Sequence, residues 1–196
     1  MGKSLIGCGV ALIVGILVIA MMVGGVYNRL VTLNEAVDSS WAQVENVYQR
    51  RADLIPTLVA TVKGAADFEQ ETLQNVTEAR SKVGRLSFDE APNAEQMTAF
   101  QAQQDALSSA LSRLLVVVER YPELTATQAF RDLQVQLEGT ENRIAGERRR
   151  YNEIAQEYNT ARRRFPAVLF AGLLGFEEKA YFEAQPGAEE PPKVEF

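Results

Sequence analysis

The chain has 196 residues, which is enough for one domain with a sizeable hydrophobic core beside a membrane segment. It carries 26 acidic and 20 basic residues, and the resulting net charge of −6 argues against nucleic acid as a partner. There is no histidine and only one cysteine, Cys8, which excludes intrachain disulfides and Cys-based zinc sites. We therefore predict no enzyme, no catalytic or metal-binding residues, no cofactor and no small-molecule substrate.

An uncharged apolar run covers residues 5–26. A helix of about 22 residues is about 33 Å long, which is enough to cross a bilayer core of about 30 Å. A secretory signal peptide has a shorter apolar core of about 7–15 residues and a small-residue cleavage site after it, and neither feature is present. We interpret residues 1–26 as a retained transmembrane anchor. Leu5–Cys8 resembles a lipoprotein cleavage box, but that box should follow the apolar core, and here it precedes it.

Small residues recur every fourth position in this anchor, at Gly7, Ala11 and Gly15. Such a stripe lets two membrane helices approach closely, so it is a candidate surface for self-association. The alternative is that glycine is simply common in membrane helices. Lys3 and Arg29 lie on opposite sides of the anchor, so the positive-inside rule does not fix its orientation.

Helical periodicity extends over residues 27–166 and predicts an all-α fold, an antiparallel bundle after the single transmembrane helix. We expect four helices, at about 30–62, 67–83, 92–120 and 125–165, with a capping box formed by Thr125 and Gln128. Pro56 should kink the first of them and free the carbonyl of Ala52. The alternative has three helices, with the first two stretches forming one kinked helix. Seven-residue spacing favours packing like that of a coiled coil. One row of the last helix has no exception: Phe130, Leu137, Ile144, Tyr151, Tyr158 and Phe165.

Arg51 interrupts an apolar row of the first bundle helix, and Glu147 interrupts one of the last. A buried charge is costly unless it is paired. We predict that Arg51 meets a carboxylate of the last helix, either Glu141 or Glu147, and that this polar core fixes the helix register.

The C-terminal segment, residues 167–184, begins with ten apolar residues at 167–176, which are too few to span a bilayer. This segment either caps the bundle or lies at the membrane surface or in an oligomer contact. Just before it, Arg162, Arg163 and Arg164 either form a solvated helix end or contact anionic lipid. Residues 185–196 are rich in Pro and Glu and predict an extended acidic tail.

Ordered motifs along nearly the whole chain resemble the LemA family of bacterial membrane proteins. They are the block at residues 27–64, YPEL at 121–124, TENRI at 140–144, RRRYNEIAQEYN at 148–159, FP at 165–166, GF at 175–176, YFEA at 181–184 and the closing PPKVEF. The set is specific, although each motif alone is weak. The family often has a Tyr and a His near residues 65–69, and both are absent here.

The resemblance implies one N-terminal anchor, a short external N-terminus and a helical domain in the cytoplasm, with no established activity and no catalytic residues. Some relatives are linked to membrane-organelle formation or membrane stress. Our leading hypothesis is a self-associating scaffold of the bacterial inner membrane, with the lipid bilayer and further copies of the chain as partners. The alternative is an adaptor for other membrane proteins, such as a protease or stress sensor.

Overall fold

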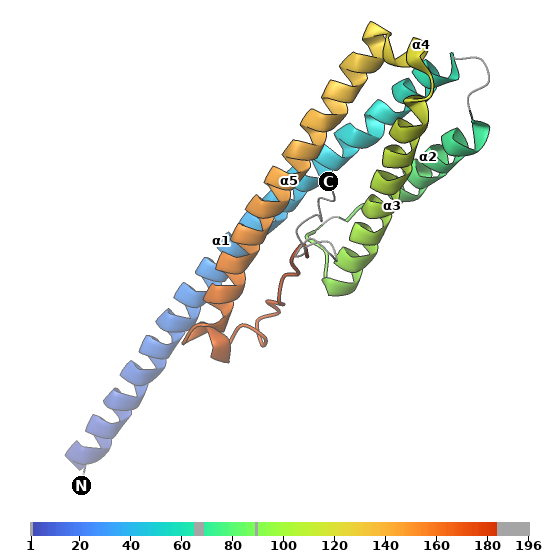
Figure 1. Cartoon of the computed structure of the whole chain (residues 1–196). Helices are drawn as coiled ribbons and strands as arrows, with labels where there is room; N and C mark the ends of the chain where they lie inside the picture. Colours follow the sequence, from blue (N-terminus) through green and yellow to red (C-terminus); the bar gives the residue numbers. More distant parts are fainter. Residues whose placement is uncertain (1, 65–68, 89, 184–196) are drawn as a thin grey trace, which may run out of the picture.

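A computed structural model describes the backbone of residues 2–64, 69–88 and 90–183, and the side chains of that part apart from residues 2–8 and 11. Figure 1 shows an elongated molecule in which the C-terminal long helix lies antiparallel along the N-terminal one. The described part has no strand, which confirms the all-α prediction. Its elements are α1 (Gly2–Lys63), α2 (Gln70–Val83), α3 (Ala94–Val118), α4 (Pro122–Thr125), α5 (Gln128–Arg163) and the 3-10 turn η1 (Ala167–Leu169).

Helix α1 is continuous over 62 residues, so the anchor and the first bundle helix are one element. At 1.5 Å per residue it is on the order of 90 Å long. Among the described residues it is the one helix long and apolar enough to cross a membrane. The backbone passes residue 26, where the anchor ends by hydropathy, without interruption.

Pro56 lies inside α1 and does not end it. A proline deprives the carbonyl four residues earlier of its usual backbone donor. That carbonyl belongs to Ala52, and Nε of Arg80 in α2 donates a hydrogen bond to it at 2.8 Å. Because α1 ends at Lys63 and α2 is a separate helix, the three-helix alternative with a kinked first helix is wrong.

Two helix starts illustrate the local chemistry of the bundle. Asn93 caps α3 with a complete capping box, since its side chain accepts from the backbone N–H of Gln96 at 2.9 Å and the Gln96 side chain accepts in return at 3.0 Å. The capping box expected at Thr125 is wrong. Thr125 ends the one-turn helix α4, and Thr127 caps α5 by accepting from the backbone N–H of Phe130.

The bundle has two halves of different construction, because α2 and α3 are much shorter than α5. They cover mainly the half that is far from the apolar N-terminus, and only the first turns of α3 reach the other half (Figure 1). We call the buried cluster there the distal core: Leu54, Ile55, Leu58, Val62, Leu73, Val76, Val83, Leu107, Leu111, Leu114, Val118, Leu124, Phe130, Leu133 and Leu137. The proximal core lies nearer the N-terminus: Val37, Trp41, Val44, Tyr48, Met97, Phe100, Ile144, Tyr151, Ala155, Tyr158 and Phe182.

Candidate membrane-proximal site

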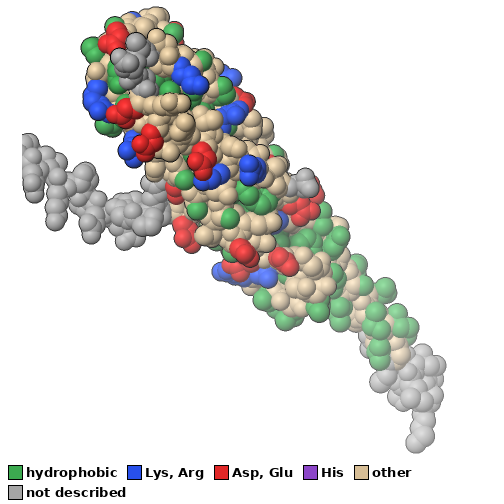
Figure 2. Space-filling view, turned by 90° about the vertical axis from the view of Figure 1, so that its right-hand side faces the viewer, with side chains coloured by type: hydrophobic (Ala, Val, Ile, Leu, Met, Phe, Trp, Pro, Cys, Tyr) green, Lys and Arg blue, Asp and Glu red, His purple; other side chains and the backbone are tan. Residues whose placement is uncertain are grey.

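The N-terminal part of α1 turns apolar side chains outward. From Leu12 to Ile19 the large apolar side chains are between 45% and 64% exposed. Figure 2 shows hydrophobic side chains along the tapering end of the molecule, whereas acidic and basic side chains gather over the bundle. A long uncharged surface of this kind suits hydrocarbon rather than water.

The small-residue stripe lies on this part of α1. Gly15 faces open space, since a Cβ atom added there would have no atom within 4 Å. The side chains of Gly7 and Ala11 lie outside the described side chains. Self-association through the stripe therefore stays a prediction.

Where the apolar segment meets the bundle, α1 is covered by the chain's own C-terminal part, which we call the cap segment (residues 165–176). Ala167 and Ala171 of this segment are buried with Leu30 of α1 and Ala161 of α5. Their small side chains let the turn lie close against both helices. The ring of Phe176 packs edge-on against Tyr27 with centroids 5.6 Å apart. The Phe165–Pro166 peptide bond is cis.

Two of the three arginines at the end of α5 bind the C-terminal part of the chain. Nε of Arg162 donates to the carbonyl oxygen of Phe176 at 2.8 Å, and its Nη1 lies 3.8 Å from a carboxylate oxygen of Glu178. Arg163 forms an ion pair with the same carboxylate, while Arg164 is exposed. Two of the three guanidinium groups thus hold the C-terminal part of the chain in place.

After Gly175, whose φ of +80° allows the turn, the chain returns along α5 as what we call the clasp segment (residues 177–183). Two asparagines of α5 bind its backbone. Asn159 accepts from the N–H of Lys179 at 3.0 Å and donates to the Lys179 carbonyl at 2.8 Å. Asn152 does the same for Phe182, at 2.9 Å in both directions.

The distance between the two asparagines along α5 matches the distance between the two residues that they bind. Asn152 and Asn159 are seven residues apart in a helix, which is about 10.5 Å along the axis. Lys179 and Phe182 are three residues apart in an extended chain, which is about 10 Å. Each asparagine therefore satisfies both backbone groups of one residue, which an extended segment outside a sheet otherwise leaves unpaired. These residues were not predicted from the sequence, although two asparagines one heptad apart beside a buried row were a signal.

The clasp delivers Phe182 into the proximal core, which is largely aromatic. Its ring stacks on Trp41 at a centroid distance of 6.0 Å and meets Tyr151 edge-on at 5.5 Å. Phe100 of α3 packs edge-on against both Trp41 and Tyr48, each at 5.1 Å. Residues from α1, α3, α5 and the clasp segment thus share one cluster.

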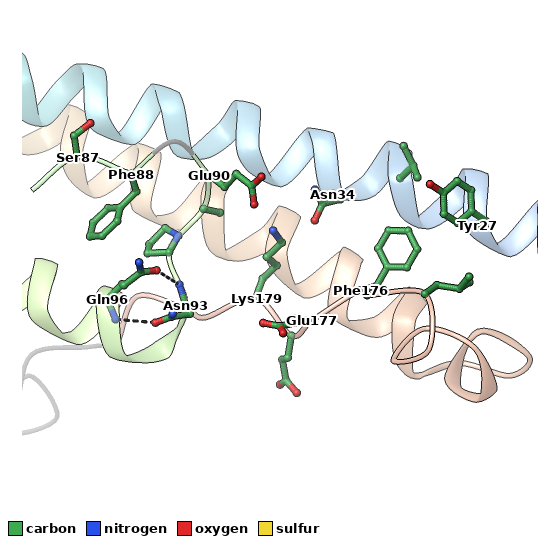
Figure 3. Close-up of a pocket in the computed structure, with 16 residues that line it drawn as sticks. Tyr27, Asn34, Ser87, Phe88, Glu90, Asn93, Gln96, Phe176, Glu177 and Lys179 are labelled. Carbon is green, nitrogen blue, oxygen red and sulfur yellow. Dashed lines mark hydrogen bonds between the residues drawn. The ribbon is translucent and has the colours of Figure 1, made fainter.

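A groove of about 780 Å³ lies beside the clasp, between α1, the loop before α3 and the cap segment (Figure 3). Tyr27, Asn34, Glu90 and Lys179 are among its lining residues. Nζ of Lys179 reaches Oδ1 of Asp38 at 3.5 Å. That carboxylate also accepts from the side chain of Asn34 and from the backbone N–H of Ala91. The groove therefore has polar and charged side chains along its wall. Asp38 connects three of its lining residues, Asn34, Ala91 and Lys179.

Arg51 lies between the two cores and is 1% exposed. Its Nη1 donates to Glu141 at 2.8 Å and to the hydroxyl of Ser108 at 2.9 Å, and its Nη2 donates to the side chain of Gln104 at 2.5 Å. Of the two carboxylates weighed from the sequence, Glu141 forms the ion pair. One carboxylate oxygen of Glu147 is buried without a hydrogen-bond partner in the described part of the chain.

Burial raises the pKa of three tyrosines in the proximal core. Desolvation raises the pKa of Tyr48, against the lowering effect of the neighbouring Arg148. It also raises the pKa of Tyr151 and of Tyr158. These side chains therefore stay neutral at physiological pH and act as packing groups. Among the described residues no cluster of three or more His, Cys, Asp and Glu side chains suits a metal ion.

An exposed apolar helix that continues into a helical bundle, closed at its near end by the C-terminal part, defines a membrane-associated helical-bundle protein. The chain belongs to the LemA family, whose sequence profile matches residues 40–196. It is 25% identical over 187 residues to magnetosome protein MamQ 2 of Paramagnetospirillum magneticum and to MamQ of Magnetospirillum gryphiswaldense, covering 84% of this chain and 67% of each relative. It is also 25% identical over 157 residues to protein LemA of Metamycoplasma hominis, covering 80% and 68% of the two chains.

Proposed function

We propose that this protein is a non-enzymatic scaffold, anchored in the bacterial inner membrane, which self-associates and thereby organises or remodels the bilayer. The observation that carries the proposal is the continuity of α1 from the apolar segment into the bundle. Because α5 and the cap segment brace α1 where it leaves the apolar part, a change in the angle between neighbouring bundles is transmitted to their anchors. Kinship with magnetosome proteins supports a role in membrane organisation.

The small-residue stripe provides the surface by which anchors approach each other. The test compares the full-length protein in mild detergent with a chain that begins at Tyr27, by electron microscopy and light scattering over a concentration series. We expect closed or extended assemblies for the full-length chain alone. Monodisperse monomers of the full-length protein at every concentration would rule the scaffold out.

Two variants locate the contact within the anchor. Gly15→Leu places a bulky side chain on the stripe, and Gly9→Leu is the matched control, since Gly9 also faces open space but lies off the stripe. Gly15→Leu is expected to reduce assembly and Gly9→Leu to leave it unchanged. Equal effects of both variants would move the self-association surface away from the stripe.

The bulk of the chain is proposed to lie in the cytoplasm. Cysteines introduced at Val116 and Val135, which are 64% and 67% exposed, report the side of the membrane in a Cys8→Ala background. A membrane-impermeant maleimide should label them only after the inner membrane is opened. Labelling in intact spheroplasts would reverse the proposed orientation.

The groove beside the clasp favours a second candidate, an adaptor that holds a segment of another membrane protein. Photo-crosslinking in cells from Glu90, on the groove, and from Val135, away from it, distinguishes the two. One dominant foreign product from Glu90 alone supports the adaptor. Products containing only this chain support the scaffold.

A further inference from the structure

The cap segment leaves four large apolar side chains exposed, while Phe170 and Phe176 are partly buried. Phe165 is 76% exposed and Leu173 is 88% exposed, with Val168 and Leu169 at 54% and 58%. The small residues of the same segment, Ala167 and Ala171, face inward. Single exposed apolar residues are ordinary, but four large ones within residues 165–173 expose much apolar surface over a short length of chain, which water disfavours.

The position of this stretch follows from the exposure of α1. From Val10 to Met22 the large apolar side chains of α1 are exposed, and the next ones along the helix, Val23 and Val26, are partly covered. Val26 packs against the cluster formed by Leu30, Ala167 and Ala171. The cap segment therefore lies at the last turn of the apolar segment, which is the level where α1 leaves the hydrocarbon of a bilayer. Figure 1 shows it wrapped beside α1 at that end of the bundle.

We propose that the cap segment is an interfacial wedge: Phe165, Val168, Leu169 and Leu173 insert among the headgroups and upper acyl chains of the bilayer that α1 spans. This inference rests on the proposed function in that α1 must be a membrane anchor. The wedge gives the bundle a second contact with the same bilayer, beside α1. With two contacts the bundle has a fixed tilt and rotation relative to the membrane plane, which a single helix crossing does not provide.

The wedge differs from the lipid contact that was one of the two alternatives for the three arginines. Arg162 and Arg163 are bound to the chain's own Phe176 and Glu178, so they hold the cap in shape instead of reaching for lipid. Arg164 is exposed immediately before Phe165, where it can meet an anionic headgroup. The contact is thus mainly apolar, with one basic residue at its edge.

We favour lipid over a second copy of the chain as the molecule that covers these four side chains, because they lie directly beside the end of the anchor. Any molecule that covers these four side chains must reach the exit point of α1, and there lipid is already present on every side that no neighbouring anchor occupies. A copy that bound through the same stretch would have to displace that lipid.

The experiment places an environment-sensitive fluorophore on a single cysteine of the full-length Cys8→Ala protein, reconstituted in vesicles of phosphatidylcholine with one quarter phosphatidylglycerol. The test position is Leu173. Val135 is the matched control, since it is an exposed apolar residue of α5 far from the cap. Ile13 is the positive control within the anchor. Quenching is measured with lipids that carry a nitroxide at the headgroup end of the acyl chain.

We expect the probe at Leu173 to emit several-fold more strongly and at shorter wavelength than the probe at Val135, and to lose most of that emission to shallow nitroxide lipids. A probe at Leu173 that behaves as the one at Val135, while the probe at Ile13 lies in lipid, overturns the wedge and leaves the anchor intact. If the probe at Ile13 is also in water, the anchor and the proposed function fail together.

Two further measurements separate lipid from a second copy of the chain as the occupant. Disulfide crosslinking between Leu173→Cys copies that persists when the lipid-to-protein ratio is raised tenfold would assign the stretch to a second copy and overturn the wedge. The Leu169→Glu, Leu173→Glu variant changes only exposed side chains, so it should fold. Carried with a probe at Val168→Cys, it should abolish quenching by shallow nitroxide lipids, whereas Val116→Glu should not.

Discussion

The distal and proximal halves of the bundle are stabilised by different kinds of contact. The distal core joins five helices, α1 to α5, through aliphatic side chains, with Phe130 as its one buried aromatic member. The proximal core joins α1 and α5 to the first turns of α3 and to an extended segment, through Trp41, Tyr48, Phe100, Tyr151 and Phe182 among others. The distal core thus consists of helices packed on helices, whereas the proximal core also includes an extended segment packed on helices.

This difference has a physical reason. A helix satisfies its own backbone and presents only side chains, so aliphatic packing suffices and tolerates substitutions that conserve volume. An extended segment brings unpaired N–H and C=O groups, which must be satisfied where they are buried. Asn152 and Asn159 provide those bonds, and the aromatic rings provide area and orientation. The half next to the apolar segment therefore needs directional contacts to hold its extended segment.

The largest expected effect comes from opening the proximal core. Phe100→Ala removes a ring that touches Trp41 and Tyr48 and should cost about 3–5 kcal/mol of unfolding free energy. The single tryptophan, Trp41, lies in this cluster, so its fluorescence should change in the native state as well.

Leu114→Ala is the matched variant in the distal core, where Leu114 is fully buried, and should cost about 2–5 kcal/mol. It should leave the native emission of Trp41 unchanged. Denaturant titrations in detergent, followed by circular dichroism and fluorescence, measure both quantities. Equal spectral changes in the two variants would mean that the halves are not separate clusters.

The next effect concerns the boundary between the halves. Glu141→Ala leaves the buried guanidinium of Arg51 without its carboxylate, and should cost about 3 kcal/mol, at the low end for a broken buried pair because Glu141 is 49% exposed. Glu138→Ala, one turn earlier on the exposed side of α5, should cost under about 0.5 kcal/mol.

Arg51→Leu should cost less than Glu141→Ala, because the carboxylate that remains reaches water. If the pair fixes register, this variant should broaden the distance distribution between spin labels on α1 and α5. A stable variant with an unchanged distribution and unchanged assembly would reject the register role.

A smaller effect is expected from the clasp. Asn159→Ala removes two hydrogen bonds to Lys179 and one from its side chain to the Tyr181 hydroxyl, for a loss of about 1–3 kcal/mol. Hydrogen exchange at residues 179–182 should accelerate while α2 and α3 stay protected. Asn142→Ala, at an exposed position of the same helix, is the control. Protection that is unchanged at Lys179 would contradict the clasp.

Periodicity predicted the helices well because each of them buries one face over several turns. In the row through Tyr151, Phe130 and Leu137 are buried in the distal core, and Ile144, Tyr151 and Tyr158 in the proximal core. The prediction is wrong for Phe165, which follows the end of α5 and is exposed. Arg51 is buried and paired with Glu141 of α5. The pattern also predicted Glu141 or Glu147 as the partner of Arg51, since a heptad fixes which turn of one helix faces which turn of the other. It did not decide between the two, and Glu141 forms the ion pair.

Three features could not be read from periodicity. A heptad row shows that Tyr151 and Tyr158 are covered, but not that an extended segment, rather than a helix, covers part of their surroundings. The asparagine pair acquires its meaning only when residues 177–183 fold back along α5. The cap segment alternates exposed and buried apolar residues over one irregular turn, which is too short for a period.

The smallest expected change in stability comes from removing one hydroxyl group from the proximal core. The hydroxyl oxygen of Tyr151 is buried and has no hydrogen-bond partner among the described residues. Tyr151→Phe therefore removes a desolvated polar group without breaking a bond, and should be neutral or stabilising by up to about 1 kcal/mol at pH 7. Tyr158→Phe, in contrast, loses the hydrogen bond from its hydroxyl to the carbonyl of Glu177 and should cost about 1 kcal/mol.

The pH dependence sharpens this contrast. Burial raises the pKa of Tyr151 in the folded chain above its ordinary value of 10.0, so folding favours the neutral phenol. That contribution is fully present below about pH 10 and is lost as the pH rises from there through the pKa of the folded state. The wild-type chain should lose stability in this alkaline range, and Tyr151→Phe should lose less. Denaturation midpoints measured between pH 8 and strongly alkaline pH decide the matter: parallel curves for the two chains would show that the Tyr151 hydroxyl reaches water or a partner in solution.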